Sequence, residues 1–160
     1  MPIIIDGYNL LWAITKPGEE SEPITDVGLC RILGVYLKAV KEKGRIVFDG
    51  VGPPDKSGFD NISNLEVVFT GRAVDADTVI EDKIRASTAP KRLTIVSSDQ
   101  RLRKASRARK AILIKSEMFW AEVLKQLSRK SKAEEPVEKR MGLTEGETKQ
   151  WLDYFGLDGQ

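Results

Sequence analysis

Four aspartates stand where short apolar segments end, or at the turn into the following segment: Asp6, Asp49, Asp77 and Asp99. Open parallel α/β sheets bind their ligands in the crevice outside the carboxyl ends of the strands. Carboxylates from separate strands can therefore converge there and either hold a divalent metal or share a proton. Three or more acids exceed what a proton-sharing pair needs, and hard oxygen ligands suit Mg²⁺ or Mn²⁺. The pattern therefore favours a metal site.

Turns and helix caps offer another explanation for each acid taken alone. Aspartate is common in turns and at helix N-caps, where its side chain accepts hydrogen bonds from the backbone. Recurrence at three strand ends and at one helix start nevertheless favours a shared site. Asp77 and Glu81 add a second indication, because residues four apart share a helix face and two like charges there favour a nearby cation. The turn dipeptides are Asp6-Gly7 and Asp49-Gly50, and the candidate caps are Asp75, Asp77 and Asp99.

The composition restricts the chemistry. The 160 residues contain no histidine and a single cysteine, Cys30. Histidine triads, histidine-based ribonuclease mechanisms and histidine-ligated zinc are therefore excluded. One cysteine also excludes a disulfide framework and a cysteine metal cluster, and we expect Cys30 to be a buried structural thiol.

Positive charge is concentrated in one region. The net charge is +2, yet residues 101–132 hold eleven Lys or Arg and two Glu, a balance of +9, which leaves −7 for the rest. A basic region on an otherwise acidic protein suits an enzyme that binds a polyanion and holds a metal, although a solvated helix face gives the same pattern. We expect the residues that contact the polyanion to be Arg101, Arg103, Lys104, Arg107, Arg109 and Lys110.

Apolar runs of strand length alternate with segments of helical spacing. This order predicts an α/β fold with a mostly parallel sheet of about five strands covered on both faces. Right-handed crossovers place the carboxyl ends of all strands, and with them the acids, at one edge. A loop that contains Pro17, Gly18 and Pro23 is expected after the turn at Asp6-Gly7, and a second loop is expected at 51–61. The expected strands are 2–5, 45–48, 65–69, 93–96 and 111–114, and the expected helices are 26–43, 77–87, 100–108 and 117–129.

The chain length suits one domain with an extension. We expect a catalytic domain at 1–130, a polar linker at 131–139 and a helical extension at 140–160 that carries Trp151, Tyr154 and Phe155. These aromatics are expected either to dock on the domain or to bind a partner, which includes a second copy of the chain in a homodimer. The sequence shows no signal peptide and no run of membrane-spanning length, so we expect a cytoplasmic protein.

Four motifs resemble one known family over about residues 2–127. IIIDGYNLL, IVFDG, DADTVIEDKI and IVSSDQRLR occur in the order found in YacP-like NYN domains, which belong to the PIN-like nucleases. The resemblance implies a Rossmann-like three-layer sandwich and a metal-dependent ribonuclease, and some relatives cleave mRNA in association with the ribosome. By matching position it implies the core acids Asp6, Asp77 and Asp99, helped by Asn9 and Glu81, with Asp49 as a further metal-ligand candidate.

The reaction expected from this resemblance is hydrolysis of an RNA phosphodiester with one or two Mg²⁺ or Mn²⁺ ions. The six cations at 101–110 named above are then the expected RNA-binding residues. Glu81 is expected to accept a proton or hold a metal-bound water, and Asn9 to orient a water or a phosphate oxygen. Gly7 is expected to let the backbone approach the substrate. Tyr8 and Phe59 are candidates for stacking a base, whereas Trp12 is expected to pack in the core beside the apolar residues Leu10 and Leu11.

Two other functions remain open from the sequence. An RNA-binding or adaptor module without turnover would keep the fold and the basic surface, and its RNA affinity would not depend on Mg²⁺. An aspartyl phosphatase would use Asp6 as a nucleophile, but such enzymes usually carry a second aspartate two residues on, where this chain has Tyr8.

Overall fold

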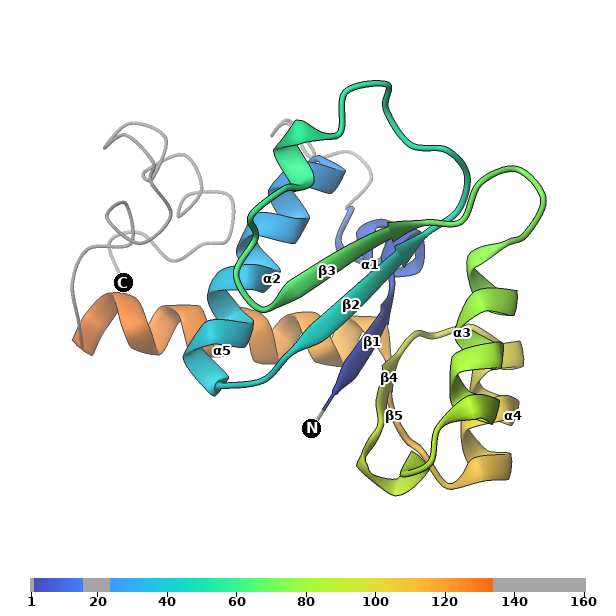
Figure 1. Cartoon of the computed structure of the whole chain (residues 1–160). Coiled ribbons are helices and arrows are strands. Elements are labelled where there is room, and N and C mark those ends of the chain that lie inside the picture. Colours follow the sequence, from blue (N-terminus) through green and yellow to red (C-terminus); the bar gives the residue numbers. More distant parts are fainter. Residues whose placement is uncertain (1, 16–23, 134–160) are drawn as a thin grey trace.

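The computed structural model describes residues 2–15 and 24–133, which form a three-layer α/β sandwich (Figure 1). Within these residues five parallel strands form one sheet in the order β3-β2-β1-β4-β5. The chain builds outward from β1 to β3 and then continues with β4 on the other side of β1, so strand order reverses beside β1. The predicted parallel α/β fold is confirmed. The strands are β1 (Ile3–Asp6), β2 (Gly44–Phe48), β3 (Leu65–Phe69), β4 (Thr94–Val96) and β5 (Ile112–Ile114).

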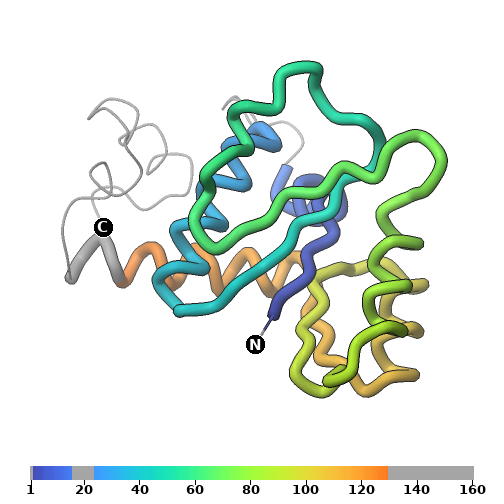
Figure 2. Tube along the Cα trace, viewed as in Figure 1, coloured from blue at the N-terminus to red at the C-terminus, as the bar shows by residue number. Residues whose placement is uncertain are grey.

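Helices cover both faces of the sheet (Figures 1 and 2). Alternate strand residues point to opposite faces: Ile3 and Ile5 join the core under α1, α2 and α5, whereas Ile4 joins the core under α3 and α4. No described helix has the length and apolar character needed to cross a bilayer. The helices are α1 (Gly7–Ile14), α2 (Asp26–Val40), α3 (Ala76–Ala86), α4 (Gln100–Arg109) and α5 (Ser116–Ala133), with short 3-10 turns η1 (Ser57–Phe59) and η2 (Pro90–Arg92).

The helix ends follow local signals, with two departures from expectation. Thr25 caps α2 by accepting a hydrogen bond from the Gly28 amide at 3.0 Å, and the helix ends where Lys41 takes the left-handed conformation with φ 58°. Helix α1 was not expected from the sequence. Helix α5 continues to Ala133 and so includes the first three residues of the segment expected to be a linker. The rest of that linker and the expected extension at 140–160 lie outside the described residues.

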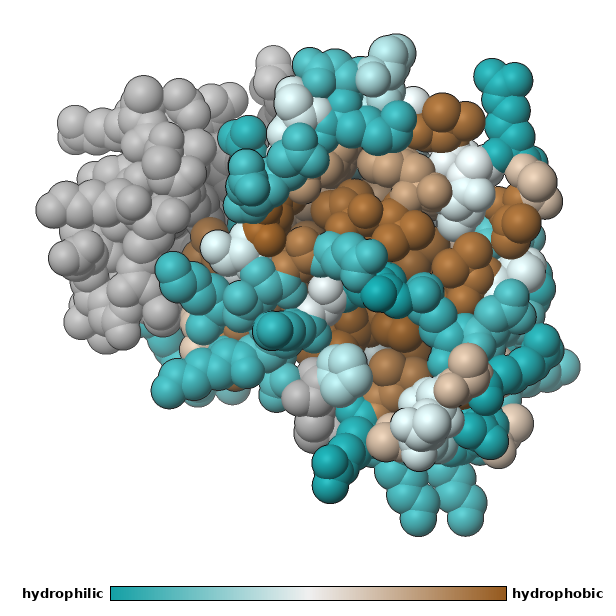
Figure 3. All heavy atoms as spheres, in the orientation of Figure 1, coloured by the Kyte–Doolittle hydropathy of each residue, from teal (hydrophilic) through white to brown (hydrophobic). Residues whose placement is uncertain are grey.

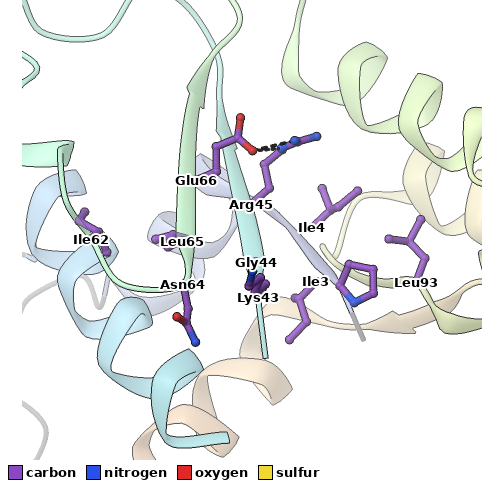
Figure 4. Close-up of a pocket in the computed structure, with 11 residues that line it drawn as sticks. Ile3, Ile4, Lys43, Gly44, Arg45, Ile62, Asn64, Leu65, Glu66 and Leu93 are labelled. Atoms are coloured by element: carbon purple, nitrogen blue, oxygen red, sulfur yellow. Dashed lines mark hydrogen bonds and ion pairs between the residues drawn. The ribbon is translucent and has the colours of Figure 1, made fainter. Parts of the chain in front are cut away.

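The amino ends of the strands form a different surface from the carboxyl ends. A pocket of about 550 Å³ lies there, where Ile3, Ile4 and Leu65 meet the ion pair between Arg45 and Glu66 at 2.7 Å (Figure 4). Apolar side chains are also visible over β2 and β3 on the face seen in Figure 3. The four predicted acids are absent from the lining of this pocket. The acids expected to take part in catalysis therefore lie at the opposite edge of the sheet, at the carboxyl ends of the strands.

Candidate active site at the carboxyl edge of the sheet

The carboxyl ends of three adjacent strands carry predicted acids. Asp6 is the last residue of β1, Asp49 follows β2 directly, and Asp99 comes three residues after β4. Asp77 joins them from the first turn of α3. The helices α1, α3 and α4 all begin at this edge, so their N-termini add partial positive charge near the acids. The four aspartates are called the acid cluster below.

Asp6 lies at the centre of the acid cluster and is only 6% exposed. Burial raises its pKa to about 7, and the negative charges of Asp77, Asp49 and Asp99 also raise it. A hydrogen bond from the Ser97 hydroxyl, 3.0 Å from Asp6 Oδ2, lowers the pKa in part. Asp6 occupies the N-cap position of α1, yet its side chain makes no capping hydrogen bond. A helix cap therefore does not account for this aspartate.

Three other acids at this edge cap helix N-termini, which is the structural role that aspartates commonly have. Asp77 differs from them: it lies inside α3, and its pKa is raised by burial and by the charges of Asp99 and Asp75, against the opposing effect of Arg101. Asp6 and Asp77 are therefore the two acids whose charge the fold penalises. The capping acids are Asp75, which accepts from the Thr78 amide at 2.7 Å, Asp99, which accepts from the Arg101 amide at 2.8 Å, and Asp49, which accepts from the Ala76 amide.

The acid cluster has the chemistry of a divalent metal site but not the finished geometry of one. Its donors are all carboxylate oxygens, the ligands preferred by Mg²⁺ and Mn²⁺. A cation would also relieve the repulsion that raises the pKa of Asp6 and Asp77. In residues 2–15 and 24–133, however, no three acidic side chains converge closely enough to hold an ion. The donor set fits a metal, and the capping hydrogen bonds of Asp49 and Asp99 both use Oδ1, which leaves the Oδ2 atom of each as a potential ligand.

Arg101 supplies a positive charge beside the acid cluster. Its Nη2 lies 2.7 Å from Glu81 Oε2 and 2.9 Å from Thr78 Oγ1, and its Nε donates to the same Glu81 oxygen at 2.9 Å. A weaker ion pair joins its Nη1 to Asp75 at 3.6 Å. The structure thus pairs Glu81, expected to accept a proton, with Arg101, expected to bind RNA.

A groove of about 680 Å³ runs between α3 and α4 and adjoins the acid cluster through Glu81 and Arg101. Its floor includes Ala105 and Ala108, and its rim is mostly cationic. Three of the predicted RNA-binding residues line it, whereas Arg103, Arg107 and Lys110 do not. Arg85 was missed by sequence reasoning, although its position four residues after Glu81 on one helix face was an available signal. The cations of the groove are Arg85, Arg101, Lys104 and Arg109.

Asn9 ties α1 to the segments that follow β4 and β5. Its Oδ1 accepts hydrogen bonds from the Ser98 amide at 2.9 Å and from the Ser116 hydroxyl at 2.7 Å. The expected contact of Asn9 with water or phosphate stays a prediction. Because Oδ1 already accepts two hydrogen bonds, the amide NH₂ group would make this contact. Sequence reasoning missed Ser97, Ser98 and Ser116, because their partners lie on distant parts of the chain.

Two expectations about aromatic residues were wrong. Trp12 is 73% exposed, because α1 turns Leu10 and Ile14 into the core and leaves the residue between them on the outer side. Phe59 is buried and packs edge-on against Phe69 with ring centroids 5.1 Å apart, so it is not available to stack a base.

Gly7 also differs from expectation, because it is buried and serves packing within the protein. A Cβ at Gly7 would lie 2.5 Å from Phe48 Cδ1 and 2.9 Å from the Val47 carbonyl oxygen. The glycine therefore lets α1 begin directly against the end of β2. We expected Gly7 to let the backbone approach the substrate, but it lets the backbone approach β2.

Comparisons with known proteins agree with the fold described above. The family model of the YacP-like NYN domain matches residues 3–153. A crystal structure of Rae1 (YacP) from Bacillus subtilis superposes with a TM-score of 0.65 at 19% identity, covering 98% of this chain and 88% of that one. A single-substitution mutant of the same protein gives a TM-score of 0.57 at 18% identity, covering 98% and 97%. At these identities the likeness shows a shared fold. No curated protein sequence matches significantly.

Proposed function

The chain belongs to the YacP-like NYN domain family, a branch of the PIN-like nucleases, and we propose that it is a metal-dependent endoribonuclease. The observation that carries this proposal is Asp6, a buried carboxyl group that caps no helix and whose pKa is raised to about 7. Three neighbouring carboxylates add to that shift. Repulsion among these carboxylates destabilises the folded protein unless a ligand compensates their negative charge. The ligand with the right chemistry is a divalent cation.

Asp6, Asp77 and Asp99 would hold Mg²⁺ or Mn²⁺, with Asp49 as a further candidate. When bound, such an ion activates water for attack on a phosphodiester and stabilises the leaving oxygen. The residues themselves must be ionised to bind it, so the raised pKa of Asp6 makes loading depend on pH. Ser97 favours the ionised form of Asp6 through its hydroxyl hydrogen bond and so prepares the site.

Arg101 and Glu81 would act together on the substrate. Glu81 Oε2 accepts two N–H groups of Arg101, which fixes the guanidinium beside the acid cluster. From that position Arg101 can bind an oxygen of the scissile phosphate as the strand enters the site. The same pairing makes Glu81 a positioning residue in the free protein. It becomes available as a proton acceptor only when phosphate takes its place on Arg101.

The groove between α3 and α4 would hold the phosphate backbone on one side of the scissile bond. Four cations line it and the floor is small and apolar, so a nucleic-acid strand meets charge without steric obstruction. Contacts of this kind position a backbone and carry no sequence information. RNA affinity should therefore fall steeply with salt.

A catalytically inactive RNA-binding module is the second candidate. The observation in its favour is that no three acidic side chains converge among the described residues, with Asp49 and Asp99 committed to helix caps. It predicts RNA binding that ignores Mg²⁺. The aspartyl phosphatase has less support, since position 8, where such enzymes carry a second aspartate, is a tyrosine whose ring packs against Phe48.

Cleavage assays separate these functions. Labelled single-stranded RNA would be incubated with the wild-type protein in Mg²⁺, Mn²⁺ or EDTA, and with Asp6→Asn, Asp77→Asn and Asp99→Asn in each metal. Asp60→Asn, at an exposed loop position after η1, is the matched control. We expect metal-dependent cleavage that the first three variants lose and the control keeps. RNA that is bound but never cut, even when ribosomes are added, would favour the binding module.

A further inference from the structure

Trp12 presents most of a large apolar ring to solvent. It is 73% exposed, more than any other large hydrophobic side chain among the described residues. The helix that carries it buries Leu10 and Ile14 completely or nearly so, which means that α1 is anchored without the indole. Tryptophan is enriched at interfaces, where its large ring offers an apolar face to a ligand or partner.

The exposed ring lies next to the acid cluster through Tyr8. Helix α1 begins directly after Asp6, and Tyr8 packs against Phe48, the residue before Asp49, with centroids 5.0 Å apart. Trp12 follows one turn later and lies nearly parallel to Tyr8, at 6.3 Å and 23°. The two rings form a continuous aromatic surface that leads away from the carboxyl edge, and they are called the aromatic pair below.

Charge decides which part of a nucleic acid fits the aromatic pair. The Tyr8 ring packs against Phe48, the residue before Asp49, and its helix begins directly after Asp6, so carboxylates lie near this ring. Phosphate is unfavourable beside those acids, whereas the flat, neutral face of a base fits an indole. The cations that suit phosphate line the groove between α3 and α4 instead.

Given the nuclease function proposed above, we propose that the aromatic pair is a base-binding subsite in which an unpaired nucleobase stacks on Trp12. The strand then crosses the acid cluster with a base held on α1 and its phosphates held in the groove between α3 and α4. A base in a duplex is already stacked and paired, so it cannot offer its face to Trp12 without unpairing. The subsite therefore selects single-stranded RNA over duplex RNA.

Binding measurements without cleavage test this subsite. The affinity of a fluorescein-labelled single-stranded RNA oligonucleotide, and of its duplex, would be measured by anisotropy in EDTA and in Ca²⁺. Trp12→Ala should weaken single-strand binding about 5- to 100-fold, the range for loss of one base stack, and leave duplex binding unchanged. Trp12→Phe should restore most of the affinity. Met118→Ala, which removes another exposed apolar side chain on α5, is the control and should change nothing.

Two results would overturn the subsite. One is equal single-strand affinity for wild type and Trp12→Ala. The other is a change of molar mass by light scattering in Trp12→Ala without any change in RNA affinity, which would assign the surface to a second copy of the chain. The nuclease proposal fails separately, when Asp6→Asn cleaves as well as wild type. Thermal melting of Trp12→Ala should match wild type, since the indole contributes little to the core.

Discussion

The Ser97 hydroxyl donates a hydrogen bond to Asp6 Oδ2 at 3.0 Å and joins the ends of two adjacent strands, β1 and β4. The Ser97 hydroxyl oxygen in turn accepts a hydrogen bond from the Asp99 amide at 3.0 Å. One buried serine therefore links the central acid of the cluster to the backbone that carries another. This link explains how the fold holds repelling carboxylates close together without a large rearrangement of the sheet.

The Asp6→Asn variant should change how stability depends on pH. The folded pKa of Asp6, about 7, exceeds the model value of 3.8, so the unfolded chain releases its proton first and wild-type stability falls as pH rises from 4 to 7. Asparagine removes this penalty, and the variant should gain on wild type by up to about 4 kcal/mol at pH 8. Urea unfolding in EDTA at a series of pH values measures the difference.

Adding a divalent metal should stabilise wild type and not the Asp6→Asn variant. The proposed metal site requires the ionised form of Asp6, so Mn²⁺ or Mg²⁺ should raise the melting temperature of wild type at pH 8 but not that of Asp6→Asn. Asp60→Asn should behave as wild type in both experiments. Parallel stability curves for wild type and Asp6→Asn would show that Asp6 titrates normally and would remove the main support for the metal site.

Ser97→Ala should move the acidic limb of the activity profile to higher pH. The hydroxyl lowers the pKa of Asp6, so its loss leaves burial and repulsion unopposed and raises that pKa further. Stability should fall by about 1–3 kcal/mol, because a buried hydrogen bond is lost. Ser98→Ala is the control, since its hydroxyl bonds Glu117 and not Asp6. Profiles of cleavage rate against pH that coincide for Ser97→Ala and wild type would contradict this role.

Arg101→Gln should weaken RNA binding with little effect on stability. The Arg101 side chain is 45% exposed and that of Glu81 is 13% exposed, so solvent still screens their pair, which should contribute about 1 kcal/mol. We expect the slope of log affinity against log salt to decrease by about 1, as loss of one phosphate contact requires. Arg101→Lys should keep part of the affinity. Arg92→Gln, at an exposed position in η2 away from the acid cluster, should leave the slope unchanged.

Gly7→Ala should destabilise the protein by about 1–3 kcal/mol, the usual cost of overpacking a core. The new methyl group would meet both the Phe48 ring and the Val47 carbonyl oxygen, and the carbonyl cannot move without disturbing β2. Gly58→Ala is milder, because its nearest atom is a Val27 methyl carbon at 3.2 Å. Denaturant unfolding of both variants checks the order, and an equal loss at the two positions would contradict it.

The strands and most helices could be predicted because their signals are local. Buried parallel strands give short apolar runs, and α2 and α3 carry caps at their first turns, Thr25 and Asp75. Helix α1 was missed because Asp6-Gly7 has the composition of a turn. The reason for a glycine at the start of this helix is its close contact with Phe48, which is a tertiary contact. Trp12 was misplaced for the same reason: its neighbours are apolar, but its position on an unrecognised helix decides its exposure.

The candidate site was predicted in outline and not in detail. Parallel topology alone brings Asp6, Asp49 and Asp99 to one edge. The pairing of Arg101 with Glu81 joins residues 20 apart, and the contact of Asn9 with Ser116 joins residues 107 apart. Both depend on how helices pack, which no sequence motif in this chain encodes. Which carboxylates hold a metal remains a prediction.

The products of RNA cleavage test the central claim most directly. Labelled single-stranded RNA would be digested with wild type and with Asp6→Asn in Mn²⁺, with an EDTA control, and the ends of the fragments identified by mass spectrometry. Hydrolysis by activated water predicts linear phosphate and hydroxyl ends, produced by wild type only with metal and reduced at least about 100-fold in Asp6→Asn. Cleavage that persists in EDTA, is equal in Asp6→Asn, or leaves 2′,3′-cyclic phosphates would contradict it.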